Sequence, residues 1–148
     1  MSDSPANRPA FTIDVANRVL EQHFAAWVRS LDIAVVDVDA NGASVRMRFG
    51  DALCREGGIV SGQALAALAD TAMVIAIASA SGGYRPMATV DLHTTFMRPV
   101  SGQDVVARAD VDRIGRTLAF ARVAMRGVGR DAAAGPAVAS AVGTFALG

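Results

Sequence analysis

The apolar side chains of residues 14–30 recur at the spacing of an α-helix, and polar or charged side chains occupy the opposite face. This pattern predicts an amphipathic helix that lies on an apolar surface, with Asp14 as its N-cap. Residues 1–10 are polar and contain proline, so we expect a flexible tail there and a single domain over residues 11–148. The apolar face consists of Leu20, Phe24, Trp27, Val28 and Leu31.

A second helical stretch covers residues 61–80, where Ala, Leu and Met dominate and no glycine or proline follows Gly62. The pair Gly82-Gly83 is expected to end this helix. From Gly57 to Tyr84 the only charged residue is Asp70. A helix that is apolar on every side is a buried helix, and a sheet that wraps around it on one side leaves part of it uncovered. Another element or another subunit must cover the remainder, and we therefore expect an oligomer.

The remaining segments show the two-residue period of β-strands. Asn41-Gly42 lies between the first two of them and predicts a β-hairpin. The order of elements is one helix, two strands, one helix and four strands, which predicts an α+β fold with an antiparallel sheet. The predicted strands are residues 33–39, 43–49, 87–97, 104–114, 117–126 and 137–147, with loops at 50–58 and 128–135.

Composition narrows the class of protein. The 148 residues are 52% hydrophobic and include 14 basic and 14 acidic side chains, so no net charge directs the chain to nucleic acid or to a membrane. Cys54 is the only cysteine, which excludes an intrachain disulfide and agrees with a cytoplasmic location, and the N-terminus lacks the pattern of a signal peptide. The apolar stretch 64–80 is rich in alanine and contains Asp70, so we interpret it as a core helix and not as a membrane span.

Asp70 is the first candidate for chemistry, because a lone carboxylate in apolar surroundings is costly to bury. Apolar surroundings raise the pKa of such a group, and nearby N–H donors lower it. Isolated buried carboxylates often mark active sites, but such a residue can also brace a neighbouring backbone segment, and the sequence leaves both roles open. The glycine-rich run from Gly57 to Gly62 leads into the helix N-terminus, which favours a thioester oxyanion or a phosphate. Ser61 is the expected N-cap.

Two segments of the chain resemble a known family. Residues 57–72 read GGIVSGQALAALADTA and resemble the signature of hotdog thioesterases of the phenylacetic-acid-degradation type. Residues 89–99, TVDLHTTFMRP, resemble the strand that follows in that family, and the resemblance as a whole covers residues 31–147. It implies a hotdog fold, in which an antiparallel sheet wraps around a central helix, and it implies dimers or tetramers whose active sites lie between subunits.

The resemblance also implies roles for individual residues. Asp70 matches the acidic residue that activates water or attacks the thioester directly. Gly62 matches the glycine whose N–H holds the oxyanion, and Thr89 matches the hydroxyl that orients the water. Ser61 stands where the family usually has histidine, and Gln63 replaces a glycine, but both side chains still offer hydrogen-bond donors.

The expected substrate-binding residues are basic or lie near the glycine-rich run. Arg55, which stands where the family often has asparagine, is a candidate for gripping the phosphates of coenzyme A together with Arg98 and Arg116. Gly57 and Gln63 complete this set.

We therefore expect an acyl-CoA thioesterase that hydrolyses a small-to-medium or aromatic acyl-CoA to free acid and CoA. No metal or redox cofactor is expected, and the enzyme is expected to be a cytoplasmic homodimer or homotetramer. Two alternatives stay open, namely a non-catalytic acyl-CoA-binding module and an acyl-thioester hydratase or dehydratase.

Other reactive side chains point less clearly to chemistry. Cys54 has no base nearby in the sequence, and Ser61 lacks the nucleophile-elbow pattern. Two-residue alternation places His93 on the same strand face as Thr89 and Asp91, but no third metal ligand is evident. The aromatic residues of the first helix are interpreted as packing residues, and that helix can also close over the acyl end of a substrate.

Overall fold

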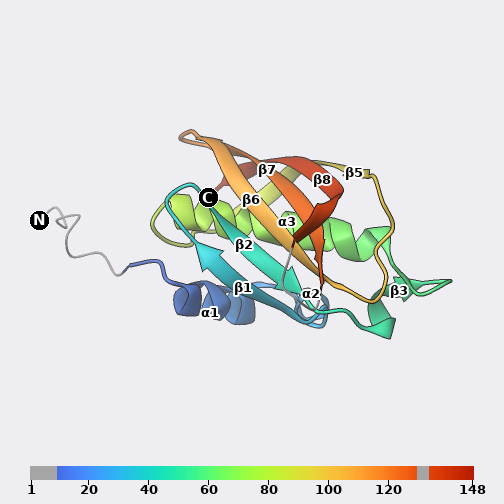
Figure 1. Ribbon diagram of the computed structural model, residues 1–148. Helices are drawn as coiled ribbons and strands as arrows, with labels where there is room; N and C mark the ends of the chain where they lie inside the picture. Colours follow the sequence, from blue (N-terminus) through green and yellow to red (C-terminus); the bar gives the residue numbers. More distant parts are fainter. Residues whose placement is uncertain (1–9, 130–133) are drawn as a thin grey trace, which may run out of the picture.

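One antiparallel sheet curls around a long helix in the computed structural model, which describes residues 10–129 and 134–148 (Figure 1). The order of strands across the sheet is β1-β2-β6-β7-β8-β5. The predicted α+β architecture is confirmed, whereas the tail predicted at residues 1–10 falls almost entirely outside the described residues. The strands of the sheet are β1 (Ile33–Val38), β2 (Gly42–Met47), β5 (Met87–Phe96), β6 (Asp104–Ile114), β7 (Leu118–Val128) and β8 (Ala134–Leu147).

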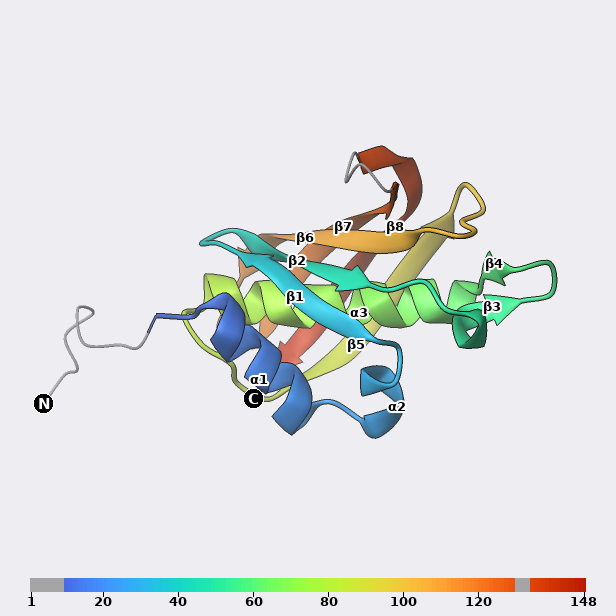
Figure 2. The same cartoon turned by 60° about the horizontal axis from the view of Figure 1, so that its bottom comes forward.

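The long helix α3 (Gly62–Ala80) packs against the inner face of the sheet (Figure 2). Ser61 is its N-cap, as predicted, because the Ser61 hydroxyl accepts a hydrogen bond from the N–H of Ala64 at 3.2 Å. The helix ends at the predicted glycine pair. Gly82 has a φ of +77°, and the N–H of Gly83 donates to the carbonyl of Ala78 at 2.9 Å. By length and composition alone α3 is apolar enough to cross a membrane, but most of it is buried inside the fold.

The β1–β2 hairpin forms where it was predicted, although its turn differs from the expected Asn41-Gly42 turn. The Asp39 side chain accepts hydrogen bonds from the N–H groups of Asn41 at 2.8 Å and Gly42 at 2.9 Å, so the turn residues are Ala40 and Asn41. Gly42 is already the first residue of β2. A Cβ on Gly42 would lie 2.0 Å from the carbonyl oxygen of Ala109 on β6, so close strand approach explains this glycine.

The loop predicted at residues 50–58 contains short regular elements. The 3-10 helix η2 (Asp51–Leu53) is followed by β3 (Cys54–Arg55), which pairs with β4 (Ile59–Val60) as a separate two-stranded ribbon. This ribbon leads directly into the N-terminus of α3.

The predicted helix over residues 14–30 consists of two helices. Phe24 and Ala25 have extended backbone and separate α1 (Ile13–His23) from the single turn α2 (Ala26–Arg29). The prediction of Asp14 as N-cap is wrong, because the Thr12 hydroxyl accepts the capping hydrogen bond from the N–H of Val15 at 3.2 Å. Asp14 lies in the first turn instead, where its charge is favourable to the helix dipole.

Asn17 attaches α1 to the edge strand β1. Its side-chain oxygen accepts a hydrogen bond from the N–H of Val35 at 2.8 Å, and its amide nitrogen donates to the carbonyl of Val35 at 3.1 Å. The buried side chains of Ala16, Val19 and Leu20 pack beside this clamp. Figure 2 shows α1 beside β1, and the clamp holds the two elements together.

One stripe of α3 is covered only in part. Its members are exposed or half-buried, whereas most other side chains of α3 are buried. The stripe recurs every three or four residues and so follows one face of the helix. This is the uncovered face that the sequence predicted. It consists of Gln63, Ala66, Ala67, Asp70 and Val74.

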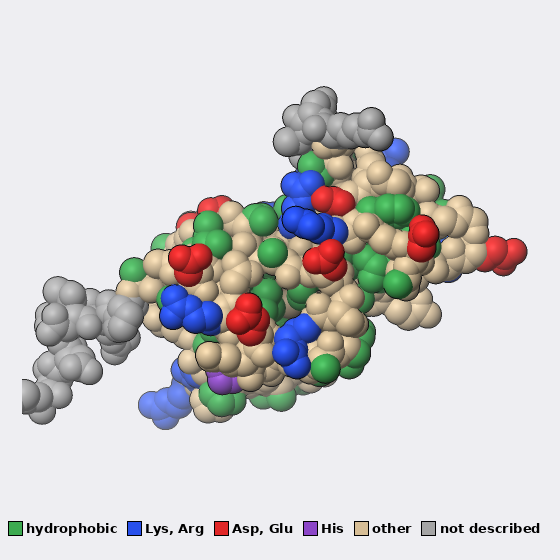
Figure 3. Space-filling model, turned by 90° about the horizontal axis from the view of Figure 1, so that it is seen from below, with side chains coloured by type: hydrophobic (Ala, Val, Ile, Leu, Met, Phe, Trp, Pro, Cys, Tyr) green, Lys and Arg blue, Asp and Glu red, His purple; other side chains and the backbone are tan. Residues whose placement is uncertain are grey.

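The edge strand β5 exposes apolar side chains. Val90 is 61% exposed, Phe96 53%, and Met97, which follows the strand, 50%. An edge strand with an apolar surface is a site at which another chain can add to a sheet. By contrast, acidic and basic side chains are interspersed on the face shown in Figure 3.

Candidate active site

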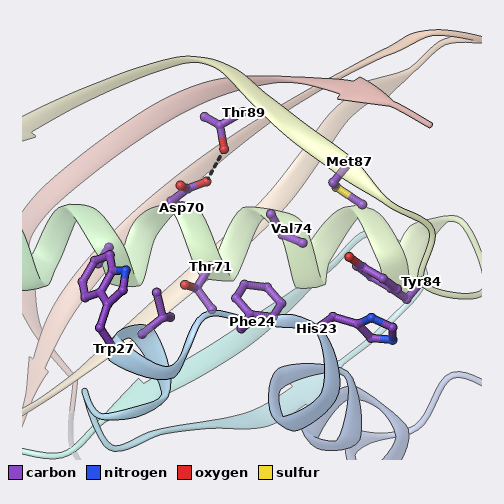
Figure 4. Close-up of a pocket in the computed structure, with 11 residues that line it drawn as sticks. His23, Phe24, Trp27, Asp70, Thr71, Val74, Tyr84, Met87 and Thr89 are labelled. Carbon is purple, nitrogen blue, oxygen red and sulfur yellow. Dashed lines mark hydrogen bonds between the residues drawn. The ribbon is translucent and has the colours of Figure 1, made fainter.

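Asp70 lies near the middle of α3 on its partly covered stripe. The Asp70 Oδ1 atom accepts a hydrogen bond from the hydroxyl of Thr89 on β5 at 2.9 Å (Figure 4). Burial raises the pKa of Asp70 above its usual value, and the hydrogen bond from Thr89 offsets part of this rise. Within residues 10–129 and 134–148, Asp70 forms no ion pair and no side-chain hydrogen bond to a backbone group. The alternative role, in which Asp70 braces a neighbouring backbone segment, therefore has no support among these residues. Such a carboxylate is suited to accept a proton from water.

A β-bulge at Val90 turns Thr89 toward α3. Thr89 pairs with the fully buried Phe145, whereas Asp91, two residues later, pairs with Thr144 on the other face of the sheet. The prediction that Thr89 shares a face with Asp91 and His93 is therefore wrong, because the extra residue reverses the alternation. In the part of the chain that the structure describes, no three potential metal-ligating side chains are grouped together.

Asp70 and Thr89 line a cavity of about 240 Å³ between α3 and the α1–α2 segment. Most of the other lining side chains are apolar or aromatic, as is typical of a site for a small organic group. An apolar cavity of about 150 Å³ holds benzene, so this cavity has room for one ring and a short linker. The remaining lining residues are His23, Phe24, Trp27, Val28, Ala67, Thr71, Val74, Tyr84 and Met87.

A second cavity, of about 530 Å³, lies at the N-terminus of α3 and brings together three of the predicted site residues, Arg55, Gly62 and Arg98. Its other walls are largely apolar. A Cβ on Gly62 would lie 3.3 Å from the ring of Phe96, so the Gly62 backbone sits against that exposed ring. Within the described residues, the first N–H groups of α3 at Gly62 and Gln63 donate to no protein acceptor.

The two cavities of one chain do not share a reaction centre. Gly62 and Asp70 lie eight residues apart on one straight helix, which corresponds to about 12 Å along its axis. A carbonyl group held by the N–H of Gly62 is therefore out of reach of the Asp70 carboxylate in the same chain.

Three predicted substrate-binding residues lie outside both cavities. Arg116 is in the β6–β7 turn, where its carbonyl accepts a hydrogen bond from Arg85 at 3.4 Å, at the end of β5 opposite to Arg98. Gln63 is exposed on the first turn of α3, and Gly57 has a φ of +84° in the β3–β4 turn. Ser61 is held in place by its capping hydrogen bond.

The sequence interpretation missed several residues of the first cavity. His23, Tyr84 and Met87 come from three separate elements, and no spacing pattern links them. Phe24 and Trp27 were interpreted as packing residues, and the structure places both at the cavity wall. That the first helix can close over the acyl end of a substrate stays a prediction. The only available signal was the clustering of aromatic residues in a chain that is 5% aromatic.

The wrapped sheet and its buried central helix define the hotdog fold. Residues 57–133, more than half of the chain, match the sequence model of the Thioesterase superfamily, and the chain therefore belongs to this superfamily. Membership supports hydrolysis of a thioester as the type of reaction.

Known proteins agree with this assignment. Zebrafish thioesterase superfamily member 2 superimposes with a TM-score of 0.79 at 25% identity, over 94% of this chain and all of that one (100%). A thioesterase of Haemophilus influenzae shares the fold with a TM-score of 0.79 at 18% identity, over 95% of this chain and 92% of that one. A Thermoplasma acidophilum protein named "putative esterase" is 26% identical over 98 residues, which cover 66% of this chain and 74% of that protein.

Proposed function

We propose that the protein is an acyl-CoA thioesterase that works as a homodimer, with Asp70 as the general base. Asp70 carries the proposal, because it is a lone carboxylate with a raised pKa at the wall of an apolar cavity and is hydrogen-bonded only to Thr89 within the described residues. Such an arrangement is typical of a group that takes a proton during catalysis. The enzyme belongs, on this proposal, to the phenylacetic-acid-degradation type, with Ser61 in the position of the usual histidine.

The dimer follows from two features of the surface. The β5 edge exposes Val90 and Phe96, and the neighbouring stripe of α3 is only partly covered. A second copy that pairs with β5 would extend the sheet and cover this stripe. It would also bring Gly62 of the partner subunit toward Asp70, which one chain alone does not achieve because of the distance of about 12 Å along α3.

The reaction then uses groups from both subunits. The thioester carbonyl oxygen accepts a hydrogen bond from the N–H of Gly62 of the partner subunit, and the attacking water molecule lies beside the hydrogen-bonded pair of Asp70 and Thr89. Asp70 takes a proton from this water while the water oxygen bonds to the carbonyl carbon. The N–H of Gly62 of the partner subunit stabilises the oxyanion that forms. Collapse of this intermediate breaks the carbon–sulfur bond and releases the carboxylic acid and the CoA thiolate, which takes up the proton.

The second cavity suits the CoA portion of the substrate. Arg55 and Arg98 line it at the entrance to α3, and an arginine can bind a phosphate through two parallel hydrogen bonds. Its apolar walls, including Ile59, Leu65 and Val100, would contact the pantetheine arm. The acyl group would then occupy the cavity of about 240 Å³ next to Asp70.

The first experiment is a panel of acyl-CoA thioesters with release of free thiol as the readout. Turnover that disappears in Asp70→Asn supports the proposal. Binding of acyl-CoA without turnover by the wild type would favour a binding module, and hydration of an enoyl-CoA would favour a hydratase.

The shared site has its own test, because Gly62 is the first residue of α3. Gly62→Pro removes the N–H at a position where helices accept proline, and the extended Ser61 (ψ 149°) suits the residue before proline. Gly62→Ala keeps the N–H and is the matched control. Mixing Asp70→Asn with Gly62→Pro should restore roughly a quarter of wild-type activity, since half of the randomly mixed dimers contain one intact site. No recovery in dimers shown to exchange subunits would refute a site shared between subunits.

A further inference from the structure

The cavity beside Asp70 has two different ends (Figure 4). Asp70 and Thr89 lie between Trp27 on one side and the side chains of His23 and Tyr84 on the other. Val74, one helical turn after Asp70, lies between Asp70 and these two rings, so the cavity follows the axis of α3. An acyl group whose carbonyl carbon is next to Asp70 and whose chain runs past Val74 meets His23 and Tyr84.

Two stacked rings line the side of the cavity beyond Val74. The ring centroids of His23 and Tyr84 are 4.4 Å apart with an angle of 27° between the ring planes. His23 is the last residue of α1 and Tyr84 follows the glycine turn after α3, so the stack joins two segments that are remote in sequence. His23 is exposed to solvent and Tyr84 is half-buried, so the stack lies at the rim of the cavity.

Each ring is positioned by a separate device. The Asn17 clamp on Val35 fixes α1, and with it the position of His23. The positive φ of Gly82 turns the chain back beneath α3 and places Tyr84 against the cavity. Both devices act on backbone, so they fix the two chain segments that bear the rings.

We propose that the His23–Tyr84 stack sets the upper limit on acyl length, so that the substrates are thioesters of short-chain or single-ring acids. This inference rests on the proposed function, since it assigns the acyl group to the cavity beside Asp70. The volume of about 240 Å³ exceeds that of a benzene-binding cavity of about 150 Å³ by little more than a short linker. Longer chains meet the stacked rings and leave part of the acyl group outside the apolar walls.

The test is a ladder of saturated acyl-CoA thioesters from acetyl to lauroyl, assayed with the wild type, Tyr84→Ala and Tyr84→Phe. For Tyr84→Ala we expect kcat/KM to peak at a chain longer by at least two methylenes, with a gain of about fourfold for each further methylene that enters. Tyr84→Phe keeps the stacked ring and should retain the wild-type length limit. His23→Ala, at an exposed position, is a second variant should Tyr84→Ala fold poorly, and it should also raise the limit.

A binding experiment separates this inference from the proposed function. Trp27 is the only tryptophan and lines the cavity, so its fluorescence reports occupancy without any turnover. Straight-chain primary alcohols of increasing length should bind with an upper length limit in the wild type and a higher limit in Tyr84→Ala, even if no thioester is hydrolysed. The same limit in the wild type and both alanine variants, or no alcohol binding at any length, would overturn the inference.

Discussion

Replacing Asp70 with asparagine tests the chemistry with almost no change in shape. The asparagine side-chain oxygen can still accept the hydrogen bond from the Thr89 hydroxyl, now 2.9 Å from Asp70 Oδ1, but it cannot take a proton from water. A general base contributes about 10²–10⁴ in rate, which equals about 3–5 kcal/mol of the activation barrier. We therefore expect kcat to fall by this factor, while KM changes little because the cavity keeps its walls.

The same substitution should stabilise the fold. Because burial raises the pKa of Asp70, the folded protein binds its proton more tightly than the unfolded chain does, so stability is lost as the pH rises through the raised pKa. Above that pKa, Asp70→Asn should gain about 0.5–1 kcal/mol in the free energy of unfolding, a modest value because solvent screens a half-buried carboxylate. Below the pKa of an unfolded aspartate the gain should vanish.

Thiol release and urea denaturation measure the two effects side by side. Asp91→Asn, on the outer face of β5, is the matched control and should change neither quantity. More than a tenth of wild-type turnover in Asp70→Asn, or a loss of stability at neutral pH, would refute the role of Asp70 as a partly buried general base.

Three further substitutions test other parts of the structure. Thr89→Val removes the hydrogen bond that lowers the pKa of Asp70, so the acidic limb of the pH profile of kcat/KM should move to higher pH; an unmoved limb would contradict the assignment. Asn17→Ala breaks both hydrogen bonds to Val35 and should cost about 1–3 kcal/mol in urea denaturation, whereas Asn17→Gln, which retains the amide, should cost less. Gly42→Ala would force a Cβ to within 2.0 Å of a β6 carbonyl oxygen and should cost at least about 2 kcal/mol in thermal unfolding.

Elements specified by local chemistry could be predicted from the sequence. The limits of α3 follow from the Ser61 cap and the Gly82-Gly83 turn, both of which act within a few residues of chain. The strand β6 (Asp104–Ile114) was predicted with its observed bounds, because the alternation from Val105 to Val111 is clear in the sequence, although a bulge at Asp112 interrupts the pairing near its end. Asp70 stood out for a similar reason, since a single charge in an apolar helix is visible without knowledge of the neighbours.

Features that depend on contacts between distant segments could not be predicted. The bulge at Val90 is a matter of register against β8, and it reverses the face on which Asp91 and His93 lie. The extended pair Phe24-Ala25 interrupts a segment whose side-chain spacing is helical throughout. Arg116 was grouped with the other arginines by charge alone, and only the strand order shows that its turn lies at the opposite end of β5 from Arg98.

The α1–α2 segment lies outside the part of the chain that matches the family, although it supplies part of the cavity wall. The family match begins at residue 57, whereas His23, Phe24 and Trp27 lie before it on a separate stretch of chain. The helix that bears the carboxylate and the aromatic side chains that face it are thus encoded in different parts of the gene. On the proposed function, a change within the first thirty residues would alter the wall that faces the acyl group without touching Asp70 or Thr89, so two related enzymes would share a reaction and differ in the acid that they release.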